Sequence, residues 1–272
     1  MLASPARGFV GGRIRFFDHQ LSIARDVCAR HRIRVLLADE VGLGKTIEAL
    51  LILHNLLLTD RVENVLILVP PALVHQWMAE SYLRFNLLLT VVGQDTHEGG
   101  IIDVESEDLA EQLLASQLYV CPLGVDVGEF FAQTEWDIVI VDEAHHLQPG
   151  SAEFALVEQL AAETEHVILL SATPDRHGEE AHFRRLALLD PARFHDIDAY
   201  FRESQNYREL ATVAERLQRG APLDADDRAL LQDRLAGTDL DKLLAADDRR
   251  TQHLLLARLL DLHGIGRVMF RN

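Results

Sequence analysis

The sequence has few cysteines and no long apolar run. Two cysteines among 272 residues, Cys28 and Cys121, provide neither a disulfide framework nor the Cys/His spacing of a metal site. The longest apolar stretch, residues 47–58, is interrupted by polar side chains and is shorter than the ~20 residues that a bilayer span needs. The first residues also lack the apolar core of a secretory signal. We therefore expect a cytoplasmic protein without a membrane partner.

Lysine is nearly absent, and the charge balance is acidic. Only Lys45 and Lys242 are lysines among 26 basic side chains, and 43 acidic side chains give a net charge of -17. Residues 99–195 carry 19 acidic and 4 basic side chains, whereas residues 1–98 carry 10 of each. The acidic side chains of residues 99–195 could contact a protein partner or keep the protein in solution. A nucleic-acid track could use the neutral first third, with Arg13, Arg15, Arg30, Arg32 and Arg34 as the candidate arginines.

An apolar run at residues 33–37 stops at a glycine-bearing turn and is followed by a helical pattern. This order of strand, loop and helix is typical of a nucleotide-phosphate site. Gly42 and Gly44 allow backbone N–H groups to approach phosphate oxygens at the positive end of the helix. Lys45 would lie along the β- and γ-phosphates, and Thr46 would offer its hydroxyl to Mg²⁺. Alone, the motif could be an ordinary glycine-rich turn. The predicted ATP-binding residues are Asp39, Glu40, Val41, Gly42, Leu43, Gly44, Lys45 and Thr46.

A carboxylate pair follows a second apolar run, residues 138–141, which is typical of a buried parallel strand. Ligands of open α/β sheets bind at the carboxyl ends of the strands. Asp142 would hold Mg²⁺, directly or through water, and Glu143 would orient and deprotonate the attacking water. A solvated acidic turn is the alternative for the pair alone, but a phosphate loop about a hundred residues earlier favours catalysis. Lys45, Asp142 and Glu143 are therefore the predicted catalytic residues.

Two hydroxyl residues, Ser171 and Thr173, follow a third apolar run before a proline that ends regular structure. On their own they could simply cap the end of a strand. Their hydroxyls could also hydrogen-bond His145. This contact would communicate the presence of the γ-phosphate to the surface that binds the nucleic-acid track. We predict this coupling role for His145, Ser171 and Thr173.

The motifs Asp-Glu-x-Gly-x-Gly-Lys-Thr, Asp-Glu-Ala-His and Ser-Ala-Thr, in this order and separation, resemble superfamily 2 helicase-like ATPases. The resemblance is to the Swi/Snf class of double-stranded DNA translocases, which has an acidic residue such as Asp39 where the general pattern has glycine. Further stretches, from Asp18-His19-Gln20 to the closing residues 267–272, resemble the bacterial RNA polymerase-associated branch of that class. The resemblance implies ATP and Mg²⁺ as cofactors, double-stranded DNA and RNA polymerase as partners, and a place in the bacterial cytosol or nucleoid.

The resemblance also assigns residues outside the three motifs. An equivalent glutamine reads the adenine edge in the family, so Gln20 is assigned to adenine; as a bare residue it could instead cap a helix over about residues 19–30. The family grips one DNA strand with a motif that here falls on His75, Gln76 and Trp77. These three are predicted nucleic-acid contacts, although an aromatic at helical spacing, such as Trp77, could equally belong to the core.

The expected fold class is α/β, a RecA-like lobe with a parallel sheet flanked by helices over residues 1–195. Residues 196–263 show only helical periods and resemble a helical insertion between motor lobes. Residues 264–272 resemble a strand that opens a second lobe. The chain is therefore expected to be a fragment of a larger motor, whose second lobe supplies the arginine fingers.

The expected function is the ATP-binding motor lobe of an ATP-dependent double-stranded DNA translocase that acts on transcription complexes and recycles RNA polymerase. The lobe alone is expected to bind Mg·ATP weakly and to show little turnover. Two alternatives remain. One is a nucleotide-dependent protein-binding module without turnover, and the other is a lobe of a strand-separating superfamily 2 helicase.

Overall fold

The chain is described by a computed structural model that covers residues 17–38, 44–93, 101–103, 116–126, 134–172, 178–202, 204–205, 213, 216, 224–234 and 269–270. It divides into two compact units, residues 1–195 with 268–272, and residues 196–267. In the second unit the structure describes α9, Ala225–Arg234. Where the predicted domains begin and end stays a prediction.

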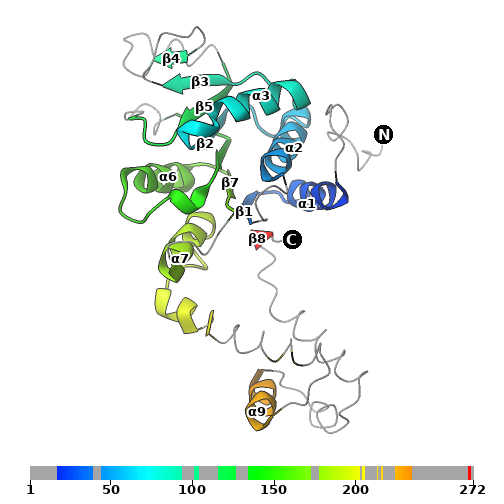
Figure 1. Ribbon diagram of the computed structural model, residues 1–272, viewed down its shortest axis with the longest axis vertical. Helices are drawn as coiled ribbons and strands as arrows, with labels where there is room; N and C mark the ends of the chain where they lie inside the picture. Colours follow the sequence, from blue (N-terminus) through cyan, green and yellow to red (C-terminus); the bar gives the residue numbers. More distant parts are fainter. Residues whose placement is uncertain are drawn as a thin grey trace. The chain divides into compact units, whose positions relative to one another are not determined.

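The first unit is built on an eight-stranded sheet with the order β4-β3-β5-β2-β6-β7-β1-β8 (Figure 1). Its neighbouring strands all pair in parallel, which confirms the predicted α/β fold class. The strands are β1 Arg34–Leu37, β2 Val65–Val69, β3 Thr90–Gly93, β4 Ile101–Asp103, β5 Leu118–Pro122, β6 Ile138–Val141, β7 His166–Leu170 and β8 Met269–Phe270.

Helices cover both faces of this sheet (Figure 1). Helices α1, α2 and α3 lie on one side, and α6 and α7 lie on the other. None of the helices in the described part of the chain has both the length and the apolar character to cross a membrane. The helical elements are α1 Asp18–Cys28, α2 Lys45–Leu58, η1 Pro71–Leu73, α3 Val74–Phe85, η2 Ala144–His146, α6 Ala152–Glu163 and α7 Gly178–Leu189.

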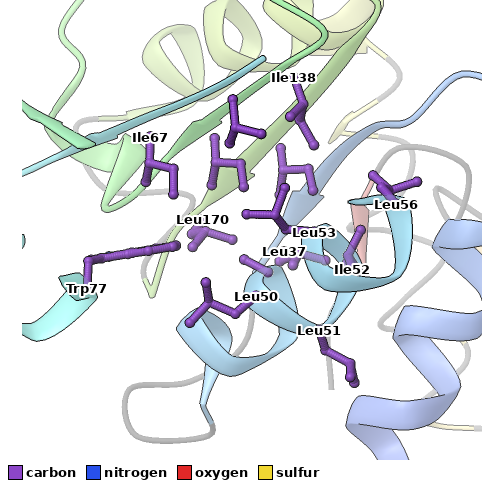
Figure 2. Close-up of a cluster of buried hydrophobic side chains, with 14 of the residues drawn as sticks. Leu37, Leu50, Leu51, Ile52, Leu53, Leu56, Ile67, Trp77, Ile138 and Leu170 are labelled. Atoms are coloured by element: carbon purple, nitrogen blue, oxygen red, sulfur yellow. The ribbon is translucent and has the colours of Figure 1, made fainter. Parts of the chain in front are cut away.

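Helix α2 is buried along most of its length, because the sheet, α1 and α3 surround it. Its Leu50 and Leu53 pack against alternate strand residues, among them Leu37, Ile67 and Leu170 (Figure 2). A helix that is covered on several sides needs apolar residues around most of its circumference, and the sequence of α2 supplies them. This packing fixes the position of the first turn of α2, where the predicted phosphate-binding lysine lies.

Arg34 is a structural residue. Its guanidinium donates hydrogen bonds to the carbonyl oxygens of Ala161, of Thr164 at 3.1 Å and of Leu188 at 2.8 Å. These carbonyls lie at the ends of α6 and α7, where the last carbonyl groups of a helix lack partners within it. Burial lowers the pKa of Arg34 to about 10, so the side chain keeps its charge at neutral pH. The expectation that Arg34 serves a nucleic-acid track is therefore wrong; Arg13 and Arg15 lie outside the described residues.

The strand predicted near the end of the sequence pairs with β1. In β8, Met269 lies opposite Leu36 and Phe270 lies opposite Leu37. The sequence assigned this strand to a second lobe, but its described residues extend the first sheet. The physical reason is that the outer edge of β1 offers unpaired N–H and C=O groups to any neighbouring strand. Where a second lobe would begin stays a prediction.

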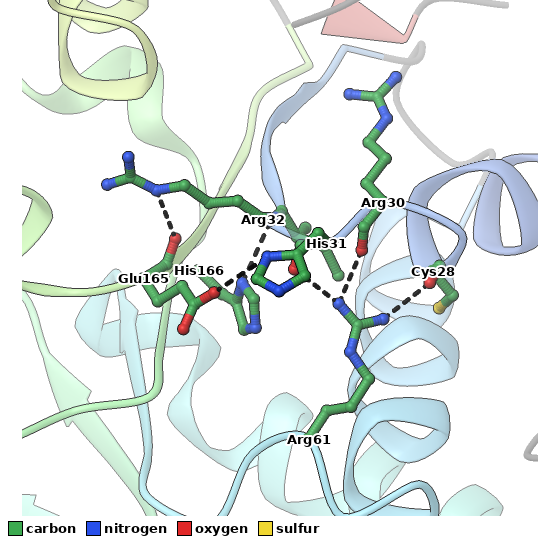
Figure 3. A network of polar contacts seen from close by, with 8 residues as sticks. Cys28, Arg30, His31, Arg32, Arg61, Glu165 and His166 are labelled. Atoms are coloured by element: carbon green, nitrogen blue, oxygen red, sulfur yellow. Dashed lines mark hydrogen bonds and ion pairs between the residues drawn. The ribbon is translucent and has the colours of Figure 1, made fainter.

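His166, the first residue of β7, is 4% exposed and accepts a hydrogen bond from the N–H of Ile33 (3.1 Å, Figure 3). The accepting atom is Nδ1, which can accept only while it carries no proton. Burial lowers the pKa of His166 below its ordinary value of 6.5, and the negative charge of Glu165 opposes this by a smaller amount. The link between β7 and the residue before β1 therefore depends on a neutral imidazole.

We expect the protein to lose stability as the pH falls below about 6.5. The unfolded chain protonates His166 near pH 6.5 and the folded chain only at lower pH, so the unfolded state binds more protons between the two values. Stability is full above this window and is lost as the pH falls through it. One hydrogen bond is worth about 1 kcal/mol, or about 2–4 °C in the thermal midpoint. Thermal unfolding at pH 7.5 and pH 5.5 measures the loss.

The test variant is His166→Asn, whose amide oxygen can accept the Ile33 N–H at either pH. It should show a smaller drop between the two pH values than the wild type. The matched control is His75→Asn, because His75 is an exposed histidine on α3, and it should keep the wild-type drop. A His166→Asn protein with the full wild-type drop would contradict the prediction.

Candidate functional site

Three of the predicted motifs leave the sheet at one edge. Strands β6, β7 and β1 are neighbours and parallel, so the residues that follow them emerge at their shared carboxyl edge. Asp142 continues the ladder with an N–H that donates to the Leu68 carbonyl at 2.8 Å, and the Ser171 N–H donates to the Leu37 carbonyl at 3.0 Å. The topology therefore brings together residues that are far apart in the sequence.

Gly44 is the N-cap of α2 and adopts a left-handed conformation, with φ 87° and ψ 37°. The backbone angle favours glycine, whereas the Gln20 Nε2 atom, 2.6 Å from the position that a Cβ atom would take, is the end of a flexible side chain that can move aside. Lys45 is the first residue of α2 and is 9% exposed, and Thr46 is half-buried beside it. A helix N-terminus with a close backbone approach and a lysine suits a phosphate group. The other loop residues, Asp39, Glu40, Val41, Gly42 and Leu43, lie outside the described residues.

Gln20 lies in the first turn of α1, and its Oε1 accepts the N–H of Phe17 at 3.1 Å. This is the helix-capping role that the sequence left open as an alternative. Its amide nitrogen lies against Gly44, so the side chain is next to the end of the predicted phosphate loop. Recognition of adenine by Gln20 stays a prediction.

Asp142 is 5% exposed, and each of its carboxylate oxygens accepts a hydrogen bond. Oδ2 accepts from the indole Nε1 of Trp77 at 2.7 Å, and Oδ1 accepts from the N–H of Glu143 at 2.8 Å. Burial raises the pKa of Asp142, whereas these two hydrogen bonds and the positive charge of Lys45 lower it. The hydrogen bonds hold the carboxylate in one orientation.

Trp77 has no exposed surface. A side chain without exposed surface cannot touch a nucleic acid. Trp77 is therefore a core residue, which was the alternative interpretation of its sequence pattern. His75 and Gln76, its neighbours on α3, are exposed and stay candidates for nucleic-acid contacts. The sequence could not have revealed the bond to Asp142, because the two residues are 65 positions apart and the Trp77 pattern indicates only an inward-facing side chain.

Glu143 also has a left-handed backbone, with φ 48° and ψ 43°, and it precedes η2. Its Oε2 lies 3.0 Å from Nδ1 of His145, whose ring lies against that of His146 with ring centroids 4.1 Å apart. Within the described residues the buried Oγ of Ser171 has no hydrogen-bond partner. The predicted bond between Ser171 and His145 is therefore absent here. Thr173 lies outside the described residues.

Helix α2, which begins at Lys45, also carries a buried carboxylate. The sequence pattern assigned no role to this residue. Glu48 is fully buried, and its Oε1 lies 3.7 Å from Nε2 of His19 in α1. The apolar residues on both sides of Glu48 in α2 were the sequence signal that could have indicated its burial. Glu48 and His19 therefore join α2 to α1 near the first turn of α2.

A cavity of about 370 Å³ lies beside this edge, between the ends of β2 and β5 and the start of α6. Apolar side chains such as Leu68 and Leu156 line it, together with the acidic residues Asp126 and Glu153. Within the described residues no group of three or more His, Cys, Asp or Glu side chains gathers as a metal site. Magnesium that arrives with a nucleotide needs only one or two protein ligands besides the phosphates, and Thr46 and Asp142 are residues of the right chemistry.

Comparison with known proteins gives consistent matches. The model of the SNF2-related domain family matches residues 27–235. The RNA polymerase-associated protein RapA of Sodalis glossinidius (strain morsitans) is 43% identical over 279 residues, which cover 99% of this chain. The chain spans 29% of the length of that relative.

Two solved structures share the fold. The Sulfolobus solfataricus SWI2/SNF2 ATPase core in complex with dsDNA has a TM-score of 0.58 and 15% identity, covering 100% of this chain and 46% of its own. The Sulfolobus solfataricus SWI2/SNF2 ATPase core domain has a TM-score of 0.58, with 14% identity and 45% of its own chain covered. At this identity the two structures establish the fold alone.

Proposed function

Because the chain belongs to the SNF2-related family, we propose that it is the ATP-binding motor lobe of an ATP-dependent translocase that moves on double-stranded DNA and acts on transcription complexes. One observation carries the nucleotide part of the proposal. Lys45 at the start of α2, which follows β1, and the buried carboxylate of Asp142, which follows β6, lie at the same carboxyl edge of a parallel sheet.

The roles of the site residues follow from their chemistry. Lys45 and the N-terminal N–H groups of α2 bind the phosphates of ATP, and Thr46 and Asp142 hold Mg²⁺. Bound Mg²⁺ neutralises charge on the phosphoryl group that is transferred. Glu143 orients the attacking water and accepts its proton. No arginine is among the predicted nucleotide residues, so turnover by this chain alone is slow, because arginine fingers are worth ~10³ to 10⁵ in rate.

The proposed track and partner rest on exposed residues of α3 and on the comparisons. His75 and Gln76 are exposed at the start of α3, where polar side chains can reach a DNA backbone. A solved structure with the same fold is described in complex with dsDNA, and the 43% identical relative is described as RNA polymerase-associated. We propose double-stranded DNA as the track and RNA polymerase as the partner.

The proposal is tested by ATP binding and hydrolysis of this chain with no DNA, with duplex DNA and with forked DNA. We expect Mg·ATP to bind, and we expect any turnover to increase more with duplex DNA than with forked DNA. A preference for forked over duplex DNA would favour a strand-separating helicase lobe. No detectable ATP binding would refute the proposal, and tight binding without turnover under any condition would favour a nucleotide-dependent protein-binding module.

A further inference from the structure

The segment formed by β2, η1 and α3 holds Asp142 in two ways. The backbone contact comes from β2, whose Leu68 carbonyl accepts a hydrogen bond from the Asp142 N–H at 2.8 Å. The side-chain contact comes from α3, because Trp77 Nε1 donates to Oδ2 at 2.7 Å. Both the backbone and the carboxylate of Asp142 are therefore tied to one continuous stretch of chain.

The hydrogen bond from Trp77 is well protected. The indole ring has no exposed surface and Asp142 is 5% exposed, so water cannot readily replace the indole N–H. A bond from a neutral donor to a carboxylate is charge-assisted, and 2.7 Å is at the short end of the usual range. Loss of this donor would leave a buried carboxylate oxygen without its partner.

We propose that Trp77 is a positioning residue for the carboxylate that holds Mg²⁺ at the nucleotide. The indole N–H fixes the rotation of the Asp142 carboxylate and so sets how strongly it holds the ion. This role rests on the proposed function of Asp142. It also makes the position of α3, which presents His75 and Gln76 at its surface, a determinant of Mg²⁺ binding.

A purely structural role for Trp77 predicts a different result. If the ring only fills the core, its loss lowers stability and weakens every ligand alike. If the N–H positions Asp142, only the contribution of Mg²⁺ is affected. Partners that orient metal ligands typically account for 10- to 100-fold in metal affinity, which gives the expected size of the effect.

The test is Trp77→Phe, which keeps an aromatic ring and removes the N–H donor. Trp136→Phe is the matched control, because Trp136 is also buried but packs edge-on against Tyr119, with ring centroids 5.7 Å apart. ATP affinity is measured by titration in Mg²⁺ and in EDTA. We expect Trp77→Phe to lose about 10- to 100-fold in Mg²⁺ and to match the wild type in EDTA, whereas Trp136→Phe matches it in both.

A second measurement applies even if Trp77→Phe does not fold. Trp136→Phe leaves Trp77 as the only tryptophan, so its emission reports the indole beside Asp142. Adding Mg²⁺ to the ATP-loaded control protein should change this emission. Unchanged emission, or an unaltered gain of affinity from Mg²⁺ in Trp77→Phe, overturns the inference alone. Absence of ATP binding by the wild type overturns the proposed function and, with it, the role of Trp77.

Discussion

Replacement of Lys45 by alanine is expected to abolish measurable ATP binding. Lys45 begins α2 directly after the left-handed Gly44 and is 9% exposed, so its position at the first turn of the helix is fixed by the packing of α2. Two charge-assisted hydrogen bonds from its ammonium to phosphate oxygens would contribute about 3–6 kcal/mol, so their loss weakens binding by roughly 10²- to 10⁴-fold. Titration with Mg·ATP measures the effect.

The chain offers a matched control for this substitution in Lys242, its one other lysine. Lys242→Ala removes the same charge and should bind ATP as the wild type does. Thermal unfolding of both variants separates loss of the site from loss of the fold. Equal ATP affinity in Lys45→Ala and the wild type would refute the phosphate-loop assignment.

Replacement of Glu143 by glutamine should leave ATP binding intact and lower turnover by about 10²- to 10⁴-fold, the usual contribution of a general base. The amide has the size of the carboxylate but cannot take a proton from water. The left-handed backbone of Glu143 costs roughly 1–2 kcal/mol, and the surrounding structure maintains it at this position. Glutamine has the same length and can keep that backbone position, although it also removes the negative charge beside His145.

Single-turnover hydrolysis, with protein in excess over labelled ATP, detects slow turnover and suits this test. Glu135→Gln is the control, because Glu135 is exposed and precedes β6, whereas Glu143 follows it. It should keep the wild-type rate. A Glu143→Gln protein that hydrolyses ATP at the wild-type rate would remove Glu143 from the mechanism.

The sequence predicted those parts of the fold that local pattern determines. The apolar run at residues 138–141 becomes β6 with the same bounds, and the helical pattern that follows the glycine-bearing turn becomes α2. Continuous apolar runs identify buried parallel strands because both faces of such a strand are covered. The fold class followed from the order of these elements.

Contacts between distant residues could not be predicted in the same way. Arg34 looks like a surface cation until α6 and α7 bring their carbonyl groups to it, and Trp77 meets Asp142 only through packing of α3 on the sheet. The bond predicted between Ser171 and His145 is absent, and the carboxylate of Glu143 lies next to the imidazole. Each outcome depends on which of several polar partners comes closest in the folded chain, and motif spacing does not contain that information.

The register of β1 has a consequence for synthesis of the chain. Val35 pairs with Ile168 and Leu36 with Met269, so both neighbours of β1 are made long after it. The nearer neighbour in sequence, β7, is 133 residues away, which at ~5–20 residues per second is a delay of about 7–27 s. Throughout that time an apolar strand with two open edges leaves the ribosome without a partner. The strand that leads into the predicted phosphate loop is therefore the segment of the nascent chain most in need of protection from aggregation.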